Sequence, residues 1–193
     1  MPPKQKITKD ELLRCGYQIA EQQGIAAVTS RSIARLAGCS IQPVFSHFPT
    51  MELLRQEVFN YACRCFMEEI LPFQGRPDFP ALVSKWTLDL ARSRPNLYKL
   101  LYISDGFPHT SMEEMMLQYE SNQKMMASLC STWGLTMADA QAVLVRSCLL
   151  LSGICTMICI NHMEISDKEA LTMVSETVQD MIERKKKKCE TSL

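Results

Sequence analysis

The segment SIQPVFSH carries side chains suited to binding a nucleic acid. Gln42 can form paired hydrogen bonds with adenine in the major groove, and Ile41 and Pro43 can pack on the methyl group of thymine. Ser46 and His47 can donate hydrogen bonds to phosphate oxygens. The segment contains no Asp or Glu, whose carboxylates would repel those phosphates. This combination of residues indicates a surface that binds DNA.

The residues around this segment predict two short helices joined by a tight turn. Thr29 and Ser40 each stand where a helix N-cap is expected, and Gly38 can take the left-handed conformation that ends a helix. Ala34 and Ala37 are small enough for a second helix to approach closely. We therefore expect a helix-turn-helix, which can place a short helix in the major groove.

Four residues further along the chain fall at spacings that could hold a metal ion or react with an oxidant. Cys148, Cys155, Cys159 and His162 follow one another at intervals of seven, four and three residues, so they share one face of a predicted long helix. A strip of small buried residues at a helix interface explains the cysteines equally well. Metal or redox sensing is therefore an alternative hypothesis, and no resident metal or cofactor is expected.

The common sequence motifs of enzymes are absent. The chain has no G-x-S-x-G, G-x-G-x-x-G, P-loop or H-E-x-x-H segment. The three histidines, His47, His109 and His162, have no nearby carboxylate at a spacing suited to acid–base catalysis. We expect no catalytic residues, and an all-helical enzyme of unknown reaction is the less favoured alternative.

Charged residues are unevenly distributed along a chain whose formal net charge is zero. Residues 1–49 hold six Lys or Arg against three Asp or Glu, residues 50–183 hold ten against 17, and residues 184–193 hold five against one. A basic N-terminal segment followed by an acidic central segment is consistent with nucleic-acid binding by the N-terminal segment. The nine scattered cysteines, an odd number, argue against a secreted disulfide framework and favour a reducing cytoplasm.

Helix caps and apolar spacing recur along the whole chain, and no strand pattern is present, so we expect an all-α fold of about nine helices. A first helix begins at the capping box of Thr8 and Glu11 and ends at Gly24. Residues 72–78, PFQGRPD, predict a break between two parts of the chain. Later helices are predicted after Thr50, Ser111, Thr136 and Ser166, and from Phe79 to Pro95.

We expect no segment that crosses a membrane. The N-terminal residues MPPKQKITKDELL lack the apolar core of a signal peptide. The most apolar run, residues 147–160, has 14 residues, fewer than a bilayer requires. We interpret this run as part of a buried helix and expect a cytoplasmic protein.

Residues 12–54 resemble the DNA-binding region of the TetR/AcrR family of transcriptional regulators. The family pattern has a helix ending in Gly, a Thr, the sequence I-A-x-x-A-G-x-S, and an aromatic residue and a Phe before a further helix. The matching positions are Gly24, Thr29, Ile33, Ala34, Ala37, Gly38, Ser40, Phe45, Phe48, Glu52 and Leu54. The resemblance implies a DNA-binding domain at residues 1–60 and an effector-binding and dimerisation domain at residues 61–193.

The resemblance also implies a homodimer whose recognition helices enter successive major grooves of a palindromic double-stranded operator. Phe45 stands where the family usually has Tyr, so it lacks a hydroxyl for a phosphate oxygen. The residues expected to contact DNA are Thr29, Arg31, Ser40, Ile41, Gln42, Pro43, Phe45, Ser46, His47 and, on the N-terminal arm, Lys6.

The later helices are expected to form the dimer interface and an effector pocket. Apolar stripes on the last two long helices predict an interface of Leu144, Cys148, Leu151, Cys155, Ile158, Val174, Val178 and Met181. The predicted pocket is lined by Trp86, Tyr98, Tyr102, Phe107, Tyr119, Met126 and Trp133, for each of which core packing is the alternative role. The sequence thus predicts a ligand-responsive dimeric regulator, most simply a repressor that a small molecule releases from its operator.

Overall fold

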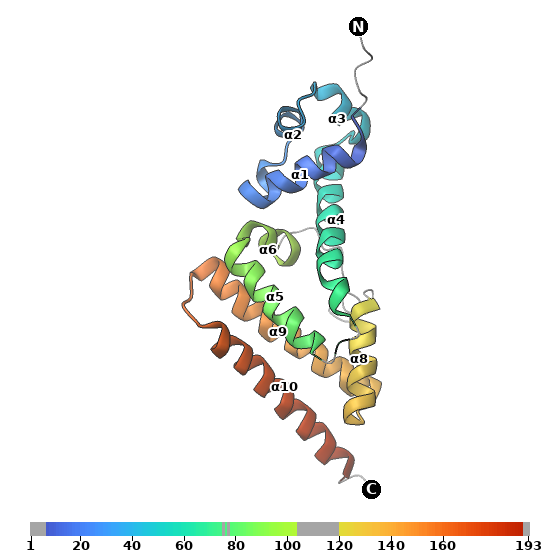
Figure 1. Ribbon diagram of the computed structural model, residues 1–193, viewed down its shortest axis with the longest axis vertical. Coiled ribbons are helices and arrows are strands. Elements are labelled where there is room, and N and C mark those ends of the chain that lie inside the picture. The colour runs from blue at the N-terminus through green and yellow to red at the C-terminus, as the bar shows by residue number, and fades with distance from the viewer. Residues whose placement is uncertain (1–6, 75, 77, 104–119, 191–193) are drawn as a thin grey trace. The chain divides into compact units, whose positions relative to one another are not determined.

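The computed structural model describes residues 7–74, 76, 78–103 and 120–190, and at residues 121 and 188–190 it describes the backbone only. These residues form helices and contain no strand, so the predicted all-α fold is confirmed (Figure 1). The chain divides into two compact units. Unit 1 comprises Met1–Pro72 and Ser93–Phe107, and unit 2 comprises Phe73–Arg92 and Pro108–Leu193. The division of function at residue 60 stays a prediction.

Unit 1 begins with helix α1, Lys9–Gln23, which starts and ends where the sequence predicts. The Glu11 carboxylate accepts a hydrogen bond from the Thr8 amide at 2.8 Å, and the Thr8 hydroxyl accepts one from the Glu11 amide at 3.2 Å. This capping box satisfies two donors at the helix start. Gly24 ends the helix with a φ of 87°, a conformation that favours glycine, and a short 3-10 helix η1, Ile25–Ala27, follows.

The helix-turn-helix consists of α2, Ser30–Leu36, and α3, Ile41–His47. Thr29 caps α2, because its hydroxyl accepts a hydrogen bond from the Ser32 amide at 3.0 Å. Ser40 occupies the N-cap position of α3, as predicted, although its side chain forms no cap hydrogen bond. Pro43, at the third helical position, has no N–H, so one of the two backbone donors that an N-cap hydroxyl can accept from is missing.

Helix α1 packs on α2 and on α4, Met51–Ile70, and α2 packs on α3. A Cβ added to Gly16 would lie 2.5 Å from Cγ2 of Val58 and 3.3 Å from Cδ1 of Ile33. Glycine at this position therefore allows α1 to lie against both α2 and α4. As predicted, α3 buries Val44 and Phe48, which are 0% and 1% exposed. The core thus fixes which face of α3 points outward.

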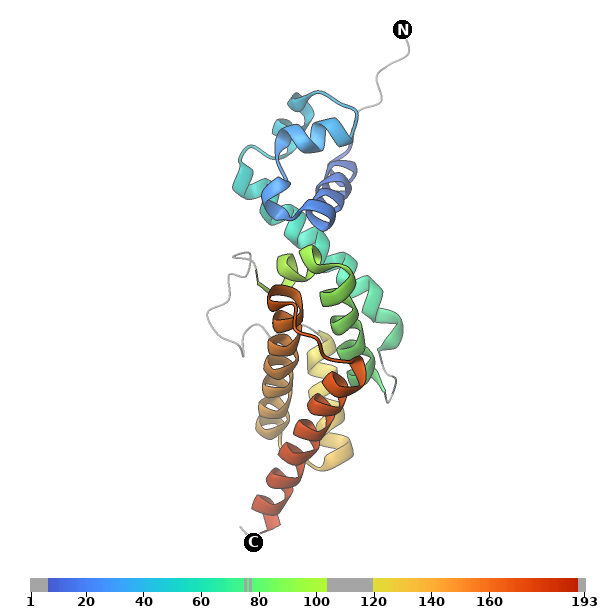
Figure 2. The same cartoon turned by 90° about the vertical axis from the view of Figure 1, so that its left-hand side faces the viewer.

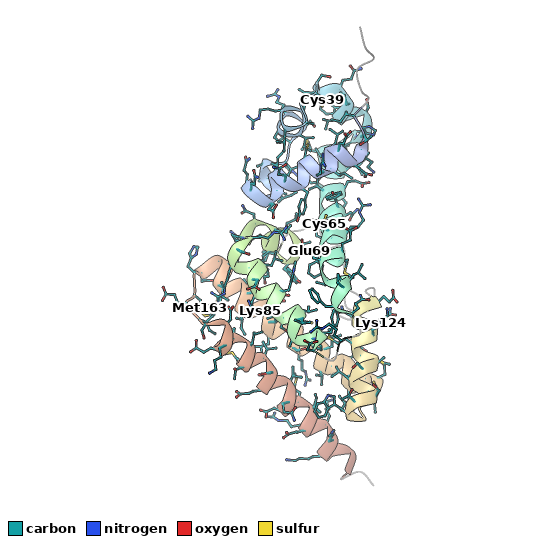
Figure 3. All side chains as sticks on the ribbon, in the orientation of Figure 1. Cys39, Cys65, Glu69, Lys85, Lys124 and Met163 are labelled. Atoms are coloured by element: carbon teal, nitrogen blue, oxygen red, sulfur yellow. The ribbon has the colours of Figure 1, made fainter. Side chains whose placement is uncertain are left out.

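Helix α6, Pro95–Tyr102, completes unit 1 by packing on α1 and α4. Arg94 precedes α6 and binds both neighbouring helices: Nε donates to Glu21 of α1 at 2.5 Å and a terminal nitrogen donates to Glu69 of α4 at 3.1 Å. It also donates to the hydroxyl of Tyr17. Glu69 is labelled on α4 in Figure 3. One guanidinium group therefore links three helices through charged hydrogen bonds.

Unit 2 contains α5, Phe79–Ser93, α8, Glu120–Trp133, α9, Met137–Asn161, and α10, Asp167–Glu190. Helix α9 packs on α8 and α10, and Figure 2 shows α9 and α10 side by side. The predicted caps at Thr136 and Ser166 are confirmed. The predicted helix start at Ser111 lies outside the described residues. The core between these helices consists of Met126, Leu135, Ala140, Val143, Leu144 and Ile182.

Helix α9 is longer than the apolar run that the sequence analysis considered. It has 25 residues, and by length and composition it could cross a membrane. A buried core helix of a soluble protein has the same length and composition, so this finding does not establish a membrane span. Within unit 2, α9 buries Val143, Leu151 and Cys155, as the predicted buried helix requires.

Candidate nucleic-acid interface

One face of α3 stays exposed while the opposite face joins the core of unit 1. Phe45 is 51% exposed and Ile41 is 37% exposed, and the side chains of Gln42, Ser46 and His47 are also exposed. Burial of Gln42 and His47 would have excluded contact of these side chains with DNA, and the structure does not bury them. The residues predicted to face DNA on α3 therefore share an accessible surface.

The surface around α3 lacks acidic groups. Residues 22–51, which include η1, α2 and α3, contain no Asp or Glu. Arg31 and Arg35 are exposed on α2, one turn apart, and neither forms an ion pair with another described residue. Sequence reasoning selected Arg31 but missed Arg35, although its spacing of four residues from Arg31 was a usable signal. Arg31 and Arg35, which have no ion-pair partner among the described residues, lie beside a helix without Asp or Glu, and this arrangement suits a polyanionic partner.

Two hydroxyl groups predicted to bind phosphate already donate hydrogen bonds within the protein. The Thr29 hydroxyl donates to the Ser32 hydroxyl at 3.0 Å, and the Ser46 hydroxyl donates to the Gln42 carbonyl at 3.0 Å. Thr29 is also half-buried by its capping role. A contact with phosphate therefore requires each hydroxyl to rotate away from its present acceptor.

The N-terminal arm is only partly described. Lys6, predicted to contact DNA, lies outside the described residues. Lys9, three residues later, binds the Glu57 carboxylate at 3.0 Å, and its Nζ lies 5.7 Å from the centre of the Phe48 ring. Lys9 therefore links the start of α1 to α4, and its charge is balanced within unit 1.

The residues predicted to line an effector pocket are divided between the two units. In unit 1, the rings of Tyr98 and Tyr102 are stacked, with their centres 4.9 Å apart. The rings of Tyr102 and Phe66 are nearly perpendicular, with their centres 6.4 Å apart. In unit 2, Met126 and Trp133 belong to the helical core, and Trp86 is half-buried on α5. The two remaining predicted residues, Phe107 and Tyr119, lie outside the described residues.

The predicted dimer-interface residues mostly face the inside of unit 2. Those on α9 and α10 with at most 8% exposure are Leu144, Leu151, Cys155, Ile158 and Val174, whereas Cys148, Val178 and Met181 are half-buried. A different set of α9 residues points outward: Leu149, Met157 and Ile160 are 49%, 45% and 45% exposed. Helix α9 is apolar on all sides, so spacing alone could not reveal which apolar face is exposed.

The cysteines and histidine at the end of α9 do not form a metal site. Among the described residues, no three His, Cys, Asp or Glu side chains form a group that could hold a metal ion. Cys155 and Cys159 are buried, whereas His162 ends the helix at a φ of 54° and is exposed. Burial raises the pKa of the Cys155 thiol to about 12, which disfavours the thiolate that metals and oxidants require. Among the described residues, the metal site considered for Cys148, Cys155, Cys159 and His162 is therefore not formed.

The geometry defines a class of protein: an all-α chain with an N-terminal helix-turn-helix whose second helix is exposed and free of acidic residues. Its fold is similar to that of the multidrug-binding protein EbrR, solved in complex with imidazole, with a TM-score of 0.55. The alignment covers 87% of this chain and 93% of EbrR at 14% sequence identity, which establishes a shared fold. No protein-family profile matches the sequence, and no curated protein is significantly similar to it.

Proposed function

We propose that the protein is a dimeric DNA-binding transcriptional regulator of the TetR/AcrR type, and that a small molecule alters its affinity for DNA. One observation carries the proposal: the helix-turn-helix exposes a face of α3 that contains Gln42 and His47 and has no acidic neighbour from residue 22 to residue 51. The similarity in fold to a multidrug-binding protein supports the ligand-responsive part of the proposal.

In this proposal, α3 lies in the major groove and α2 lies against the backbone. Gln42 reads a base pair, with adenine as its best bidentate partner, while Ile41 and Pro43 contact neighbouring bases. Arg31, together with Arg35, neutralises phosphates. The sugar–phosphate backbone is contacted by the remaining predicted residues, which are Thr29, Ser40, Phe45, Ser46, His47 and Lys6. Phe45 contributes packing there in place of a hydrogen bond.

A dimer supplies the second recognition helix that a palindromic operator requires. Leu149, Met157 and Ile160 share one exposed side of α9, at intervals that keep residues on one helix face. Gly153 stands in this stripe, and a Cβ added there would meet no atom within 4 Å. This stripe, defined as residues 149, 153, 157 and 160, lets a second helix approach closely and supports a two-fold interface that joins α9 and α10 of both chains.

The effector is proposed to be a small, largely apolar molecule. The aromatic cluster of Phe66, Tyr98 and Tyr102 in unit 1 offers ring faces and hydroxyl groups for such a molecule. The dimer is proposed to have two states, one whose α3 helices fit the operator and one whose α3 helices do not. A ligand that binds the second state more tightly lowers the affinity for DNA, by an amount set by its difference in affinity for the two states. A cytoplasmic repressor released by its ligand is the simplest such regulator.

Selection from a pool of random DNA duplexes tests this proposal. The full chain is incubated with the pool at moderate salt, and bound duplexes are amplified and sequenced over several rounds. We expect enrichment of a two-fold symmetric site whose half-sites are separated by about one helical turn, roughly 34 Å. Recovery of unrelated sequences with no common site, or of a single asymmetric half-site, would contradict a dimeric sequence-specific regulator.

A further inference from the structure

The last turns of α10 carry a run of cations that the proposed contact with DNA does not use. Residues 184–188 read RKKKK, and the side chains of Arg184, Lys186 and Lys187 are exposed. Glu183, which precedes the run, accepts a hydrogen bond from the Gln179 side chain at 3.0 Å, one turn earlier on the helix. The surface at this end of unit 2 therefore carries a concentration of positive charge.

The cationic run lies against the connection between α8 and α9. The Nζ of Lys186 lies 4.8 Å from the centre of the Trp133 ring, at the end of α8. Lys185 lies 2.5 Å from the Asp139 carboxylate, in the first turn of α9, so the charge of this lysine is balanced within unit 2. These two contacts make the end of α10 and residues 133–139 one continuous surface.

The connection beside the cations is uncharged and exposes an apolar side chain. Residues 125–138 contain no Asp, Glu, Lys or Arg. Met137, in the first turn of α9, is 55% exposed, more than any other large apolar side chain that the structure describes. Trp133 is half-buried. The surface formed by Trp133, Met137, Arg184, Lys186 and Lys187 is here called the basic corner of unit 2.

Cations around an exposed apolar side chain suit the surface of an anionic membrane. Lysine and arginine side chains meet lipid phosphates, while apolar side chains enter the boundary between headgroups and acyl chains. A DNA backbone also offers phosphates, but it offers no apolar layer for Met137. We propose that the basic corner binds the surface of a membrane rich in anionic phospholipids. Binding of this kind holds the protein at the headgroups, and no helix crosses the bilayer.

The basic corner lies outside the stripe proposed to form the dimer. Met137 precedes Leu149, the first residue of that stripe, by about 18 Å along α9. A dimer therefore presents two basic corners, and binding of both corners to one membrane strengthens the attachment beyond that of a single corner. The inference concerns a surface of unit 2 and does not rest on DNA binding by unit 1.

Co-sedimentation with lipid vesicles tests the inference. The full chain is mixed with vesicles of phosphatidylcholine that contain about one third phosphatidylglycerol, or with vesicles of phosphatidylcholine alone, and the bound fraction gives a partition coefficient. We expect binding to the anionic vesicles that weakens as the salt concentration rises, because salt screens the charges. Vesicles of phosphatidylcholine alone should bind little protein.

Substitutions at the basic corner locate the contact. Lys187→Gln should lower the partition coefficient for anionic vesicles by about fivefold, the effect of one lysine near an anionic surface. Its matched control is Lys168→Gln, which neutralises an exposed lysine roughly 30 Å away at the start of α10. Met137→Ser should lower binding by roughly fourfold. Met173→Ser, at a position of α10 that is 45% exposed, is the control for it, and both controls should bind as the unaltered protein does.

Circular dichroism shows whether each variant is folded, so a loss of binding can be assigned to the surface. No binding to anionic vesicles, or unchanged binding by both Lys187→Gln and Met137→Ser, would overturn the inference. A loss of vesicle binding in Arg31→Gln alone would place the contact on unit 1 and would also overturn it. Lys187→Gln that binds vesicles normally but random duplex DNA more weakly would instead identify nucleic acid as the partner. Selection of an operator succeeds or fails independently of these results, because the proposed DNA contact uses unit 1.

Discussion

At the scale of single residues, the side chains proposed to neutralise phosphates differ from the side chain proposed to read a base. Arg31 and Arg35 stand on α2 with no partner of opposite charge among the described residues, whereas Gln42 stands on α3 with its amide exposed. A phosphate contact acts on every DNA sequence, but a bidentate amide contact acts only on the matching base. Substitutions at these two kinds of position should therefore have different consequences.

Gln42→Ala is expected to reduce discrimination between the operator and a duplex altered at one base pair by about 1–3 kcal/mol. Arg31→Ala is expected to weaken binding to operator and random duplex alike, and to reduce the slope of log affinity against log salt by about 0.9 for one lost phosphate contact. Titrations at several salt concentrations measure both effects. An equal loss on operator and random duplex for Gln42→Ala would contradict the role assigned to Gln42.

At the scale of helices, Arg94 connects α6 to α1 and α4. Its guanidinium group binds Glu21 of α1 and Glu69 of α4, and the Asn96 side chain donates to the Glu21 carbonyl at 3.2 Å. Arg94→Ala leaves partly buried carboxylates without their cation, so we expect a loss of about 1–3 kcal/mol in the free energy of unfolding. Chemical denaturation followed by circular dichroism measures this loss.

The control for Arg94 is Arg76→Ala, because Arg76 binds Asp78 at the surface with both side chains about half exposed. An exposed pair of this kind contributes about 0–1 kcal/mol. If Arg94→Ala costs no more than Arg76→Ala, the three-helix link at Arg94 contributes little to the stability of unit 1.

The start of α10 is held to α5 by charge. Asp167 lies 3.2 Å from Lys85, labelled in Figure 3, and 3.0 Å from Arg92. The hydrogen bond from Lys85 is the main cause that lowers the pKa of Asp167 below its ordinary value of 3.8. Because the folded pKa is the lower one, the stabilisation is present above pH 3.8 and is lost as the pH falls through the folded pKa.

Asp167→Asn should therefore be less stable than the unaltered protein at pH 7, by about 0.2–1 kcal/mol for an exposed pair, and nearly equal to it at pH 2. Thermal unfolding at both pH values provides the measurement. A difference that is the same at pH 7 and pH 2 would show that the Asp167 carboxylate does not act through its charge.

The helices were predictable from local signals, whereas the exposure of their faces was not. Helix ends depend on hydrogen bonds and backbone conformation within a few residues. The structure confirms the helix ends predicted at Thr8, Gly24, Thr29 and Gly38. Ser40 also occupies its predicted N-cap position, but its side chain forms no cap hydrogen bond, and Pro43 removes one of the two donors that this hydroxyl could have used. The network of Arg94 joins residues more than 20 positions apart and leaves no periodic trace in the sequence.

At the scale of the whole molecule, the proposed regulator depends on a dimer. One α3 helix contacts too few base pairs for selective binding, whereas two half-sites joined rigidly multiply their discrimination. The sequence predicted an interface that includes Ile158 and Cys155, which are 8% and 0% exposed within the single chain. Because α9 is apolar on all sides, its sequence does not predict which side is buried. The packing of α8 and α10 against α9 determines that side.

The exposed stripe of α9 provides the test of this dimer. Met157→Glu places a charge at the centre of the stripe, where Met157 is 45% exposed, so the single chain should fold normally while the dimer dissociates. Sedimentation velocity at micromolar concentration should then give a monomer, and affinity for a two-half-site operator should fall at least tenfold while weak binding to one half-site remains. Ala127→Glu, an exposed position on α8, should leave the dimer intact. A Met157→Glu protein that stays dimeric would require the interface to lie on another surface, because a buried, unpaired carboxylate is incompatible with a packed apolar contact.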